Sequence, residues 1–190
     1  MAKHQFSITF NKVYNQKFKK YKSNYKKCIG SNSTGNQYKC ISMKRIIRKY
    51  KDEDLNDVLS SWESASKIAH PFLTEEFLTQ ERYNIPNVYL PIAETWVVEQ
   101  ESLVIGFIAL IGNEIGALFV KPEFHGTGAG RALMDKAKTL RNNLEVEVFK
   151  ENSIGRKFYS SCGFETTKEM IHEQTGNKLL RLKFTPEKGL

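Results

Sequence analysis

The 190-residue sequence predicts an α/β (α+β) fold with a mixed, mostly antiparallel central sheet of about six to seven strands, flanked by about four helices. Three observations support this prediction. Three β-rich runs between residues 95 and 120 follow one another as a meander. The last run leads through a glycine-rich loop, residues 125–130, into a segment of helical periodicity. Strand and helix patterns then alternate, which gives the order β-α-α-β-β-β-α-β-α-β-β.

The first part of the fold is predicted to be a strand followed by two helices. A strand pattern occupies residues 43–48. The first helix then has apolar residues three and four positions apart, at Leu55, Val58, Leu59, Trp62, Ala65, Ile68 and Ala69. Pro71 ends this helix, because proline disfavours the helical conformation of the residue before it. Thr74 is placed to cap a second helix, and Pro86 and Pro91 bracket a loop.

The second part contains the meander and the alternating elements. We expect strands at residues 95–100, 103–111, 115–120, 144–149, 165–172 and 178–184, and helices at residues 128–141 and 153–161. Gly163 is placed to end the later helix, since glycine adopts the left-handed conformation that such ends need. A turn at residues 175–177 joins the last two strands.

The glycine-rich loop, His125 to Gly130, is a candidate phosphate site. It stands between a strand and the start of a helix, where backbone N–H groups are unpaired and carry partial positive charge. A tight connection without a ligand explains the same glycines. The loop has no Gly-Lys-Ser/Thr ending, so it is no P-loop, and Gly126, Gly128 and Gly130 lack the spacing of a Rossmann fingerprint.

Charge is distributed unevenly along the chain. Residues 1–42 contain nine lysines and no acidic residue, whereas residues 43–190 contain 20 basic and 21 acidic residues. We therefore predict a basic, disordered N-terminal extension over residues 1–42 and a folded domain over residues 43–190, with Met43 a candidate for the true first residue. The extension attracts RNA or anionic lipid only through non-specific charge, so we do not expect the folded domain to act on nucleic acid.

The cysteines and the hydropathy of the sequence further restrict the class of protein and its cellular compartment. Cys28, Cys40 and Cys162 are odd in number and lack metal-ligand spacing, which favours a reducing, cytoplasmic location without a disulfide framework. We expect no metal site, no membrane span and no secretory signal, because no apolar run approaches the length that a bilayer requires.

Four motifs follow one another in the second half of the chain. They are the strand end Ala117-Leu118-Phe119-Val120-Lys121-Pro122, the loop His125-x-x-Gly128-x-Gly130, the segment Glu147-Val148-x-x-x-Asn152 and the ending Phe158-Tyr159-x-x-x-Gly163-Phe164. With these motifs in this order, residues 44–184 resemble the GNAT superfamily of acetyl-CoA-dependent N-acetyltransferases. His125 departs from the family pattern, which has Gln or Arg there. The resemblance implies a GNAT-like sheet that is splayed at the cofactor site, and makes residues 43–190 an acetyltransferase domain.

The resemblance also implies which residues bind acetyl-CoA. The backbone of Leu118, Phe119 and Val120 would pair with the pantetheine arm, and one of their N–H groups would polarise the thioester carbonyl. The pyrophosphate would be held by Gly126, Thr127, Gly128, Ala129, Gly130 and Arg131. Asn152 would bind the cofactor arm. From the residues alone Asn152 is also a good N-cap for the helix that follows.

Three residues are candidates for proton transfer, one as the acid and two as the base. Tyr159 stands where the family has its general acid, and a phenol with a pKa near 10 is protonated at neutral pH, although a tyrosine beside Phe158 is also a common core residue. The acceptor amine must lose a proton, for which Glu147 is our first candidate base and Glu114 the second. Solvated surface glutamates are the simpler interpretation of both.

A weaker resemblance concerns the acceptor. The stretches Trp62…His70-Pro71-Phe72 and Thr95-Trp96-Val97 resemble a small bacterial subgroup that includes peptidyl-lysine acetyltransferases. His70, Phe72 and Trp96 are accordingly expected to line the acceptor pocket. The predicted function is transfer of acetyl from acetyl-CoA to a primary amine, of a protein lysine or a small molecule, by direct attack in a ternary complex.

Two other classes of function remain open from the sequence. A catalytically inactive module of the same fold would bind acyl-CoA as a sensor, and the presence of Tyr159 and Asn152 speaks against it. An RNA-associated protein would work through the lysine-rich residues 1–42.

Overall fold

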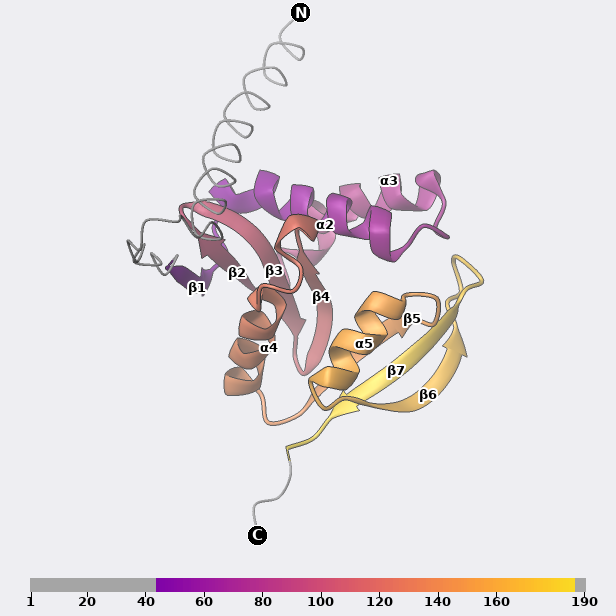
Figure 1. Ribbon diagram of the computed structural model, residues 1–190. Helices are drawn as coiled ribbons and strands as arrows, with labels where there is room; N and C mark the ends of the chain where they lie inside the picture. Colours follow the sequence, from indigo (N-terminus) through magenta and orange to yellow (C-terminus); the bar gives the residue numbers. More distant parts are fainter. Residues whose placement is uncertain (1–43, 187–190) are drawn as a thin grey trace, which may run out of the picture. The chain divides into compact units, whose positions relative to one another are not determined.

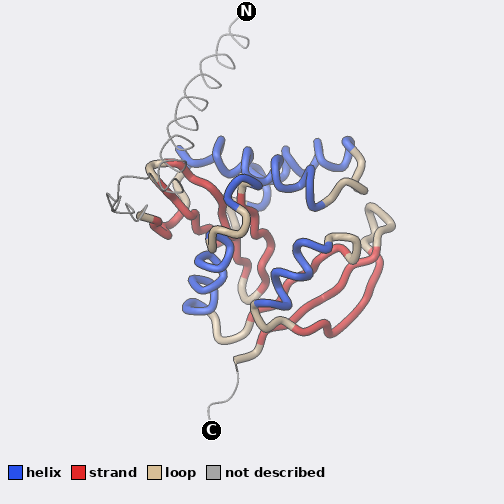
Figure 2. Tube along the Cα trace, viewed as in Figure 1, coloured by secondary structure: helices blue, strands red, loops and turns tan. Residues whose placement is uncertain are grey.

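The computed structural model describes residues 44–186, so the predictions for residues 1–42 lie outside the described residues. The chain divides into two units between Arg45 and Ile46, and apart from Arg45 the residues of the sheet and its helices belong to the second. The predicted order of strands and helices is confirmed (Figures 1 and 2). In chain order the elements are β1 (Arg45–Lys49), η1 (Asp52–Asp54), α2 (Leu55–Ala69), α3 (Glu75–Asn84), η2 (Ile85–Tyr89), β2 (Glu94–Gln100), β3 (Leu103–Ile111), β4 (Glu114–Val120), η3 (Pro122–Phe124), α4 (Ala129–Leu140), β5 (Leu144–Phe149), α5 (Ser153–Ser161), β6 (Glu165–Ile171) and β7 (Lys178–Phe184).

One mixed sheet organises the fold, as predicted. Its seven strands lie in the order β1-β2-β3-β4-β5-β7-β6. The pairs β2–β3, β3–β4, β5–β7 and β6–β7 are antiparallel, and β4–β5 is parallel. The parallel pair is separated in sequence by α4, which supplies the crossover that parallel strands require.

The core is built on β3, whose residues 103–110 are all buried. Successive side chains of a strand point to opposite faces, so burial along the whole of β3 means that both faces are covered. On one face, Val58 and Trp62 of α2 pack with Phe107 and with Val97 of β2. The other face is covered by α4, which contacts β2, β3 and β4 and buries Leu133.

The structure differs from the prediction between the two prolines. Instead of a loop, residues 85–89 form a π-helical turn that continues directly from α3. Pro86 has no backbone N–H to continue the hydrogen-bond ladder of α3, and the wider turn takes over there. Thr74 caps α3 as predicted, since its side chain accepts a hydrogen bond from the backbone N–H of Phe77 at 3.2 Å.

The splay predicted for the sheet is found between β4 and β5 (Figure 1). The two strands pair only at Glu114 with Glu145 and at Ile115 with Val146. Beyond these two pairs the strands diverge, and the rest of β4, from Gly116 onward, has no partner in β5. The sheet therefore has a gap at its centre, at the end of β4 that leads to the glycine-rich loop.

Within residues 44–186, no helix combines the length and the apolar character needed to cross a bilayer. The same part of the chain contains no group of three or more His, Cys, Asp or Glu side chains that could hold a metal ion.

Candidate active site

The glycine-rich loop presents unpaired backbone N–H groups at the start of α4. Gly126 and Gly128 have φ angles of +74° and +86°, in the left-handed region that favours glycine. Gly128 is the N-cap residue of α4, and no side chain caps the helix there. Because the first N–H groups of a helix have no partner within it and lie at the positive end of its dipole, they suit an anion. A side chain at Gly126 would enter open space.

Two side chains hold this loop against its surroundings. His125 Nε2 donates to the carbonyl oxygen of Val120, the last residue of β4, at 2.8 Å. Thr127 Oγ1 donates to the carbonyl oxygen of Phe124, also at 2.8 Å. The histidine that departs from the family pattern thus fastens the loop to the strand from which it leaves.

The first turn of α4 also contacts α5. Ala129 is buried, and a Cβ at Gly130 would lie 3.2 Å from the ring of Phe158, so the two helices approach closely here. The exposed Arg131 donates from Nη2 to the carbonyl oxygen of Ser161 at 2.8 Å. Its guanidinium is therefore held at the end of α5, beside the turn that would bind a phosphate.

Leu118, Phe119 and Val120 lie on the part of β4 that β5 leaves unpaired. Their backbone forms hydrogen bonds with β3 on one side, where Leu118 pairs with Ile108. On the gap side this backbone has the form of a sheet edge, to which an extended ligand could add as a strand.

An aromatic cluster covers the gap on the α2 face of the sheet. His70, at the end of α2, contacts Phe119 of β4 and Phe149 of β5, with ring centroids 6.3 and 5.6 Å apart. Phe72 contacts both His70 and Phe149 at 5.9 and 5.4 Å. His70 therefore lies across the two diverging strands, and the structure brings two of the three predicted acceptor residues together.

Asn152 joins this cluster to α5. Its side-chain oxygen accepts a hydrogen bond from the backbone N–H of Gly155 at 2.8 Å, which confirms Asn152 as the N-cap of α5. Its side-chain nitrogen lies 3.0 Å from His70 Nε2. Burial lowers the pKa of His70 to about 4, because the charged form loses its hydration among phenylalanine rings.

The depressed pKa of His70 predicts a loss of stability in acid. As the pH falls from 6.5 towards 4, the unfolded chain binds a proton at His70 before the folded chain does. The contribution of neutral His70 to the free energy of unfolding is therefore complete above pH 6.5 and is lost as the pH falls toward 4. We expect the free energy of unfolding to fall between pH 7 and pH 4.5 by about 2–3 kcal/mol more in the wild type than in His70→Gln, at 1.36 kcal/mol per pKa unit. Urea unfolding at the two pH values measures this, and equal falls in both proteins would contradict it.

Tyr159 lies in a buried position on α5. It is 7 % exposed, and its ring packs edge-on against Phe158 and Phe164 at centroid distances of 5.4 Å. Among the described residues no hydrogen bond reaches its hydroxyl group. Burial raises the pKa of Tyr159 above its ordinary value of about 10, so that the phenol is protonated at neutral pH.

Both candidate bases are bound to one arginine that the sequence did not reveal. Arg181 of β7 donates to Glu114 Oε2 at 2.6 Å, to Glu147 Oε1 at 2.8 Å and to Glu145 Oε2 at 2.7 and 2.9 Å. Its hydrogen bond to Glu145 is the main reason that the pKa of Arg181 is raised, and the same bond lowers the pKa of Glu145. The second oxygen of Glu147 has no partner among the described residues.

Trp96 is not brought to the aromatic cluster. It pairs with Ile108 in the sheet, next to Val97, whose side chain faces α2. Alternation along the strand therefore turns Trp96 to the other face, where the ammonium group of Lys136 lies 4.0 Å from its ring centroid. The expected grouping of Trp96 with His70 and Phe72 is not found, because Trp96 lies on one face of the sheet and the other two residues lie on the opposite face.

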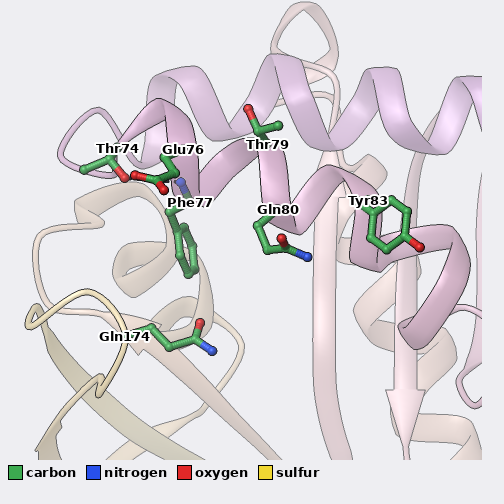
Figure 3. Close-up of a pocket in the computed structure, with 7 residues that line it drawn as sticks. All are labelled: Thr74, Glu76, Phe77, Thr79, Gln80, Tyr83 and Gln174. Atoms are coloured by element: carbon green, nitrogen blue, oxygen red, sulfur yellow. Dashed lines mark hydrogen bonds between the residues drawn. The ribbon is translucent and has the colours of Figure 1, made fainter.

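The structure adds residues to the cluster that sequence analysis missed. His172, at the end of β6, contacts Phe149 at 5.4 Å and Phe77 of α3 at 5.8 Å. An open groove of about 550 Å³ begins beside Phe77 (Figure 3). Phe77 projects from α3 toward Gln174 of the β6–β7 turn (Figure 3). The groove is lined by Thr74, Glu76, Phe77, Thr79, Gln80, Tyr83 and Gln174. No periodic signal links α3 with this turn, so only the fold could reveal the groove.

Comparison with known proteins identifies the family. A family model described as an acetyltransferase (GNAT) domain matches residues 91–166. Peptidyl-lysine N-acetyltransferase YjaB of Escherichia coli (strain K12) is 31% identical over 122 residues, which cover 64% of this chain and 82% of YjaB. Peptidyl-lysine N-acetyltransferase YiaC of the same organism is 28% identical over 120 residues, which cover 63% of this chain and 82% of YiaC.

Solved structures agree with the sequence relatives. The solution structure of apo-form YjaB from Escherichia coli matches with a TM-score of 0.67 at 28% identity, over 75% of this chain and 98% of that structure. The PaiA N-acetyltransferase from Thermoplasma acidophilum, solved in complex with coenzyme A, shares the fold with a TM-score of 0.60 at 22% identity, over 75% of this chain and all of that one. Given its identity to YjaB over most of the length of YjaB, this chain belongs to the GNAT family of acetyltransferases and is an acyltransferase.

Proposed function

We propose that this acetyltransferase passes the acetyl group of acetyl-CoA to the side-chain amine of a protein lysine. The observation that carries the proposal is the gap between β4 and β5, which lies between the uncapped first turn of α4 and the aromatic cluster around His70. The cofactor arm would lie in the gap, the pyrophosphate at the first turn of α4 and the acceptor beside the aromatic cluster, so the three groups would be neighbours in one site.

The residues fit acetyl-CoA in two respects. The first turn of α4 has no side-chain cap, and Gly126 borders open space, which suits the two charges of a pyrophosphate. The unpaired edge of β4 suits the two amide groups of the pantetheine arm. When bound, the cofactor supplies an acyl thioester. We assign the pyrophosphate to residues 126–131 and the arm to residues 118–120 and Asn152.

Tyr159 and Glu147 are proposed to move the protons. Tyr159 is protonated and buried on α5, and would donate its phenol proton to the thiolate leaving group. Glu147 lies on the same face of β5 as Phe149 of the aromatic cluster, since the two are separated by one residue. Its free oxygen would accept the proton of the amine, directly or through water, while Arg181 orients the carboxylate through the other.

The choice of a lysine acceptor is supported by the relatives and by the groove. YjaB and YiaC are both named peptidyl-lysine N-acetyltransferases. The groove between α3 and the β6–β7 turn continues outward from the aromatic cluster, and its polar lining suits the backbone of an extended polypeptide better than a compact amine. Glu76 gives it one carboxylate that would favour a basic segment.

The test is calorimetric titration of coenzyme A into the full chain, followed by an acetylation assay with acetyl-CoA. Lysine peptides and small primary amines would be compared as acceptors. We expect micromolar binding of coenzyme A and turnover with peptides. Absence of binding in a folded sample would refute the cofactor assignment, and turnover of small amines alone would refute the lysine assignment.

The role of Glu147 predicts a specific pH dependence. Replacing it by glutamine removes the group that accepts the amine proton, so we expect kcat/KM for the acceptor to fall about 100-fold at pH 7. The defect should shrink as the pH rises toward the lysine pKa near 10.4, because the amine then loses its proton without help. Glu114→Gln, which also removes a carboxylate from Arg181, is the matched control and should change kcat/KM much less. A larger effect of Glu114→Gln would move the base to that residue.

The remaining assignments concern the ends of the domain and the compartment. We propose that residues 43–190 are the catalytic domain and that the protein works in the cytoplasm, where a buried, unpaired thiol such as Cys162 stays reduced. Deleting residues 1–42 is therefore expected to leave the affinity for coenzyme A unchanged and to abolish any binding to RNA. Loss of coenzyme A binding in the shortened, folded chain would show that the boundary is wrong.

A further inference from the structure

We propose that Asn152 positions His70 in one tautomer, with the proton on Nδ1, so that His70 offers the acceptor a hydrogen-bond donor instead of a base. The inference deepens the proposed acetyltransferase function, because it assigns the chemical role of the residue that lies across the gap in the sheet. It rests on the hydrogen bonds of Asn152 and on the position of the His70 ring.

The orientation of the Asn152 amide is fixed by the start of α5. The backbone N–H of Gly155 can only donate, so the Asn152 atom that it contacts at 2.8 Å is the oxygen. The amide is held tightly there, since a Cβ at Gly155 would lie 2.8 Å from Asn152 Nδ2 and 3.1 Å from a methyl carbon of Val148. A glycine at this position leaves the room that the amide occupies.

The tautomer of His70 follows from that orientation. With its oxygen committed to Gly155, Asn152 presents its NH₂ group to His70 Nε2 at 3.0 Å. An NH₂ group can only donate, so Nε2 must be the acceptor and carries no proton. Neutral imidazole has one N–H, which is therefore on Nδ1. Nδ1 has no partner among the described residues, and it is not one of their fully buried, unpartnered polar atoms. Its N–H is thus accessible to a ligand.

The surroundings of His70 determine what that N–H can recognise. The rings in contact with it are those of Phe72, Phe119 and Phe149, none of which carries a charge or competes for the proton. His172, a second imidazole ring, contacts the cluster at Phe149 and is hydrogen-bonded to Thr175. A neutral donor in an apolar surround suits a neutral oxygen acceptor, such as the backbone carbonyl of an acceptor polypeptide beside its reacting lysine.

This arrangement also excludes His70 as the base that deprotonates the amine. The lone pair of Nε2 is engaged by Asn152, and Nδ1 already holds a proton. His70 is therefore a residue that orients the acceptor. The Asn152 NH₂ group has two N–H donors, so one is left for the proposed contact with the cofactor arm, and toward the acceptor Asn152 is a positioning residue that acts through His70.

The first test reads the tautomer without any acetyl transfer. Long-range ¹H–¹⁵N spectra of the full chain distinguish protonated from unprotonated imidazole nitrogens, and the spectrum of His70→Gln identifies the His70 signals among those of the four histidines. We expect Nδ1 protonated and Nε2 unprotonated in the wild type.

Two variants test the cause of this tautomer. Both Asn152→Asp and Asn152→Ser keep an oxygen that can accept the hydrogen bond of the Gly155 N–H. The aspartate variant turns an oxygen toward Nε2 and should place a proton there, whereas the serine variant should give a mixture of tautomers. A wild type with a proton on Nε2, or variants that both keep Nδ1–H alone, would overturn the proposal.

The second test asks whether Asn152 acts through His70. Loss of one neutral hydrogen bond predicts that Asn152→Ser raises the KM for a peptide acceptor about three- to ten-fold. In the His70→Gln background the same change should add no further rise, because the two residues act in series. If the KM of the double variant rose by the product of the factors measured for Asn152→Ser and His70→Gln alone, the proposed coupling would be overturned. If the protein acetylates no peptide at all, the proposed function fails while the tautomer measurement still decides the geometry.

Discussion

Replacement of Tyr159 by phenylalanine is expected to lower kcat about 100-fold at neutral pH, because a general acid contributes at least that factor to the departure of the leaving group. Phenylalanine preserves the edge-on contacts with Phe158 and Phe164, so the fold and the affinity for coenzyme A should be unchanged. Steady-state kinetics and calorimetric titration of the same preparation separate these quantities.

The matched control for this variant is Tyr89→Phe. Tyr89 donates its hydroxyl hydrogen bond to Glu81 at 2.9 Å, outside the site, so its loss should leave kcat as it is. Unchanged turnover in Tyr159→Phe would show that another group protonates the thiolate. If neither the wild type nor the variant turns over any acceptor but both bind coenzyme A, the alternative function of an inactive acyl-CoA-binding module is favoured.

Replacement of Gly126 by valine is expected to weaken the binding of coenzyme A about 10- to 100-fold. The backbone there has a φ of +74°, which a β-branched residue strains, and the new side chain would occupy the open space beside the first turn of α4. Loss of one charge-assisted hydrogen bond, worth about 1.5–3 kcal/mol, accounts for a factor of this size. Calorimetric titration measures it.

Gly112→Val provides the control for backbone strain. Gly112 has a φ of +59° and open space around it, but it lies in the turn between β3 and β4. Both variants should lose similar stability in thermal unfolding, and only Gly126→Val should lose affinity. Equal affinities in the two variants would show that the loop is a tight connection and that the pyrophosphate binds elsewhere.

The sequence predicted the elements whose pattern is local. The β3 run was recognisable because nearly every residue of it is apolar, as a strand covered on both faces requires. The glycine loop was recognisable because positive φ angles such as those at positions 126 and 128 favour glycine, which leaves a cluster of glycines in the sequence. The turn at residues 85–89 was predicted wrongly as a loop, because proline at the start of a helical turn looks the same in sequence as proline that ends one.

The site was only partly predictable, because its groups meet through pairings that span long stretches of chain. Arg181 faces Glu114 and Glu147 because of where β7 lies beside β5, and no spacing in the sequence encodes that register. Trp96 was grouped with His70 although strand alternation turns it to the other face, and a single tryptophan does not reveal which face its strand buries. Asn152 was assigned to the cofactor through resemblance, and its contact with His70 became visible only in three dimensions.

The short junction between β4 and β5 has a consequence for how the protein responds to its cofactor. Two residue pairs are the whole strand pairing between the four strands on one side of the sheet and the three on the other. A ligand that adds to the free edge of β4 and also contacts α5 would bind both halves of the fold at once and so hold them together. Linkage then requires the folded state to gain about 2.7 kcal/mol at a cofactor concentration 100 times its dissociation constant. Amide hydrogens on both sides of the junction should exchange more slowly together, so cofactor supply would set the lifetime of the enzyme as well as its rate.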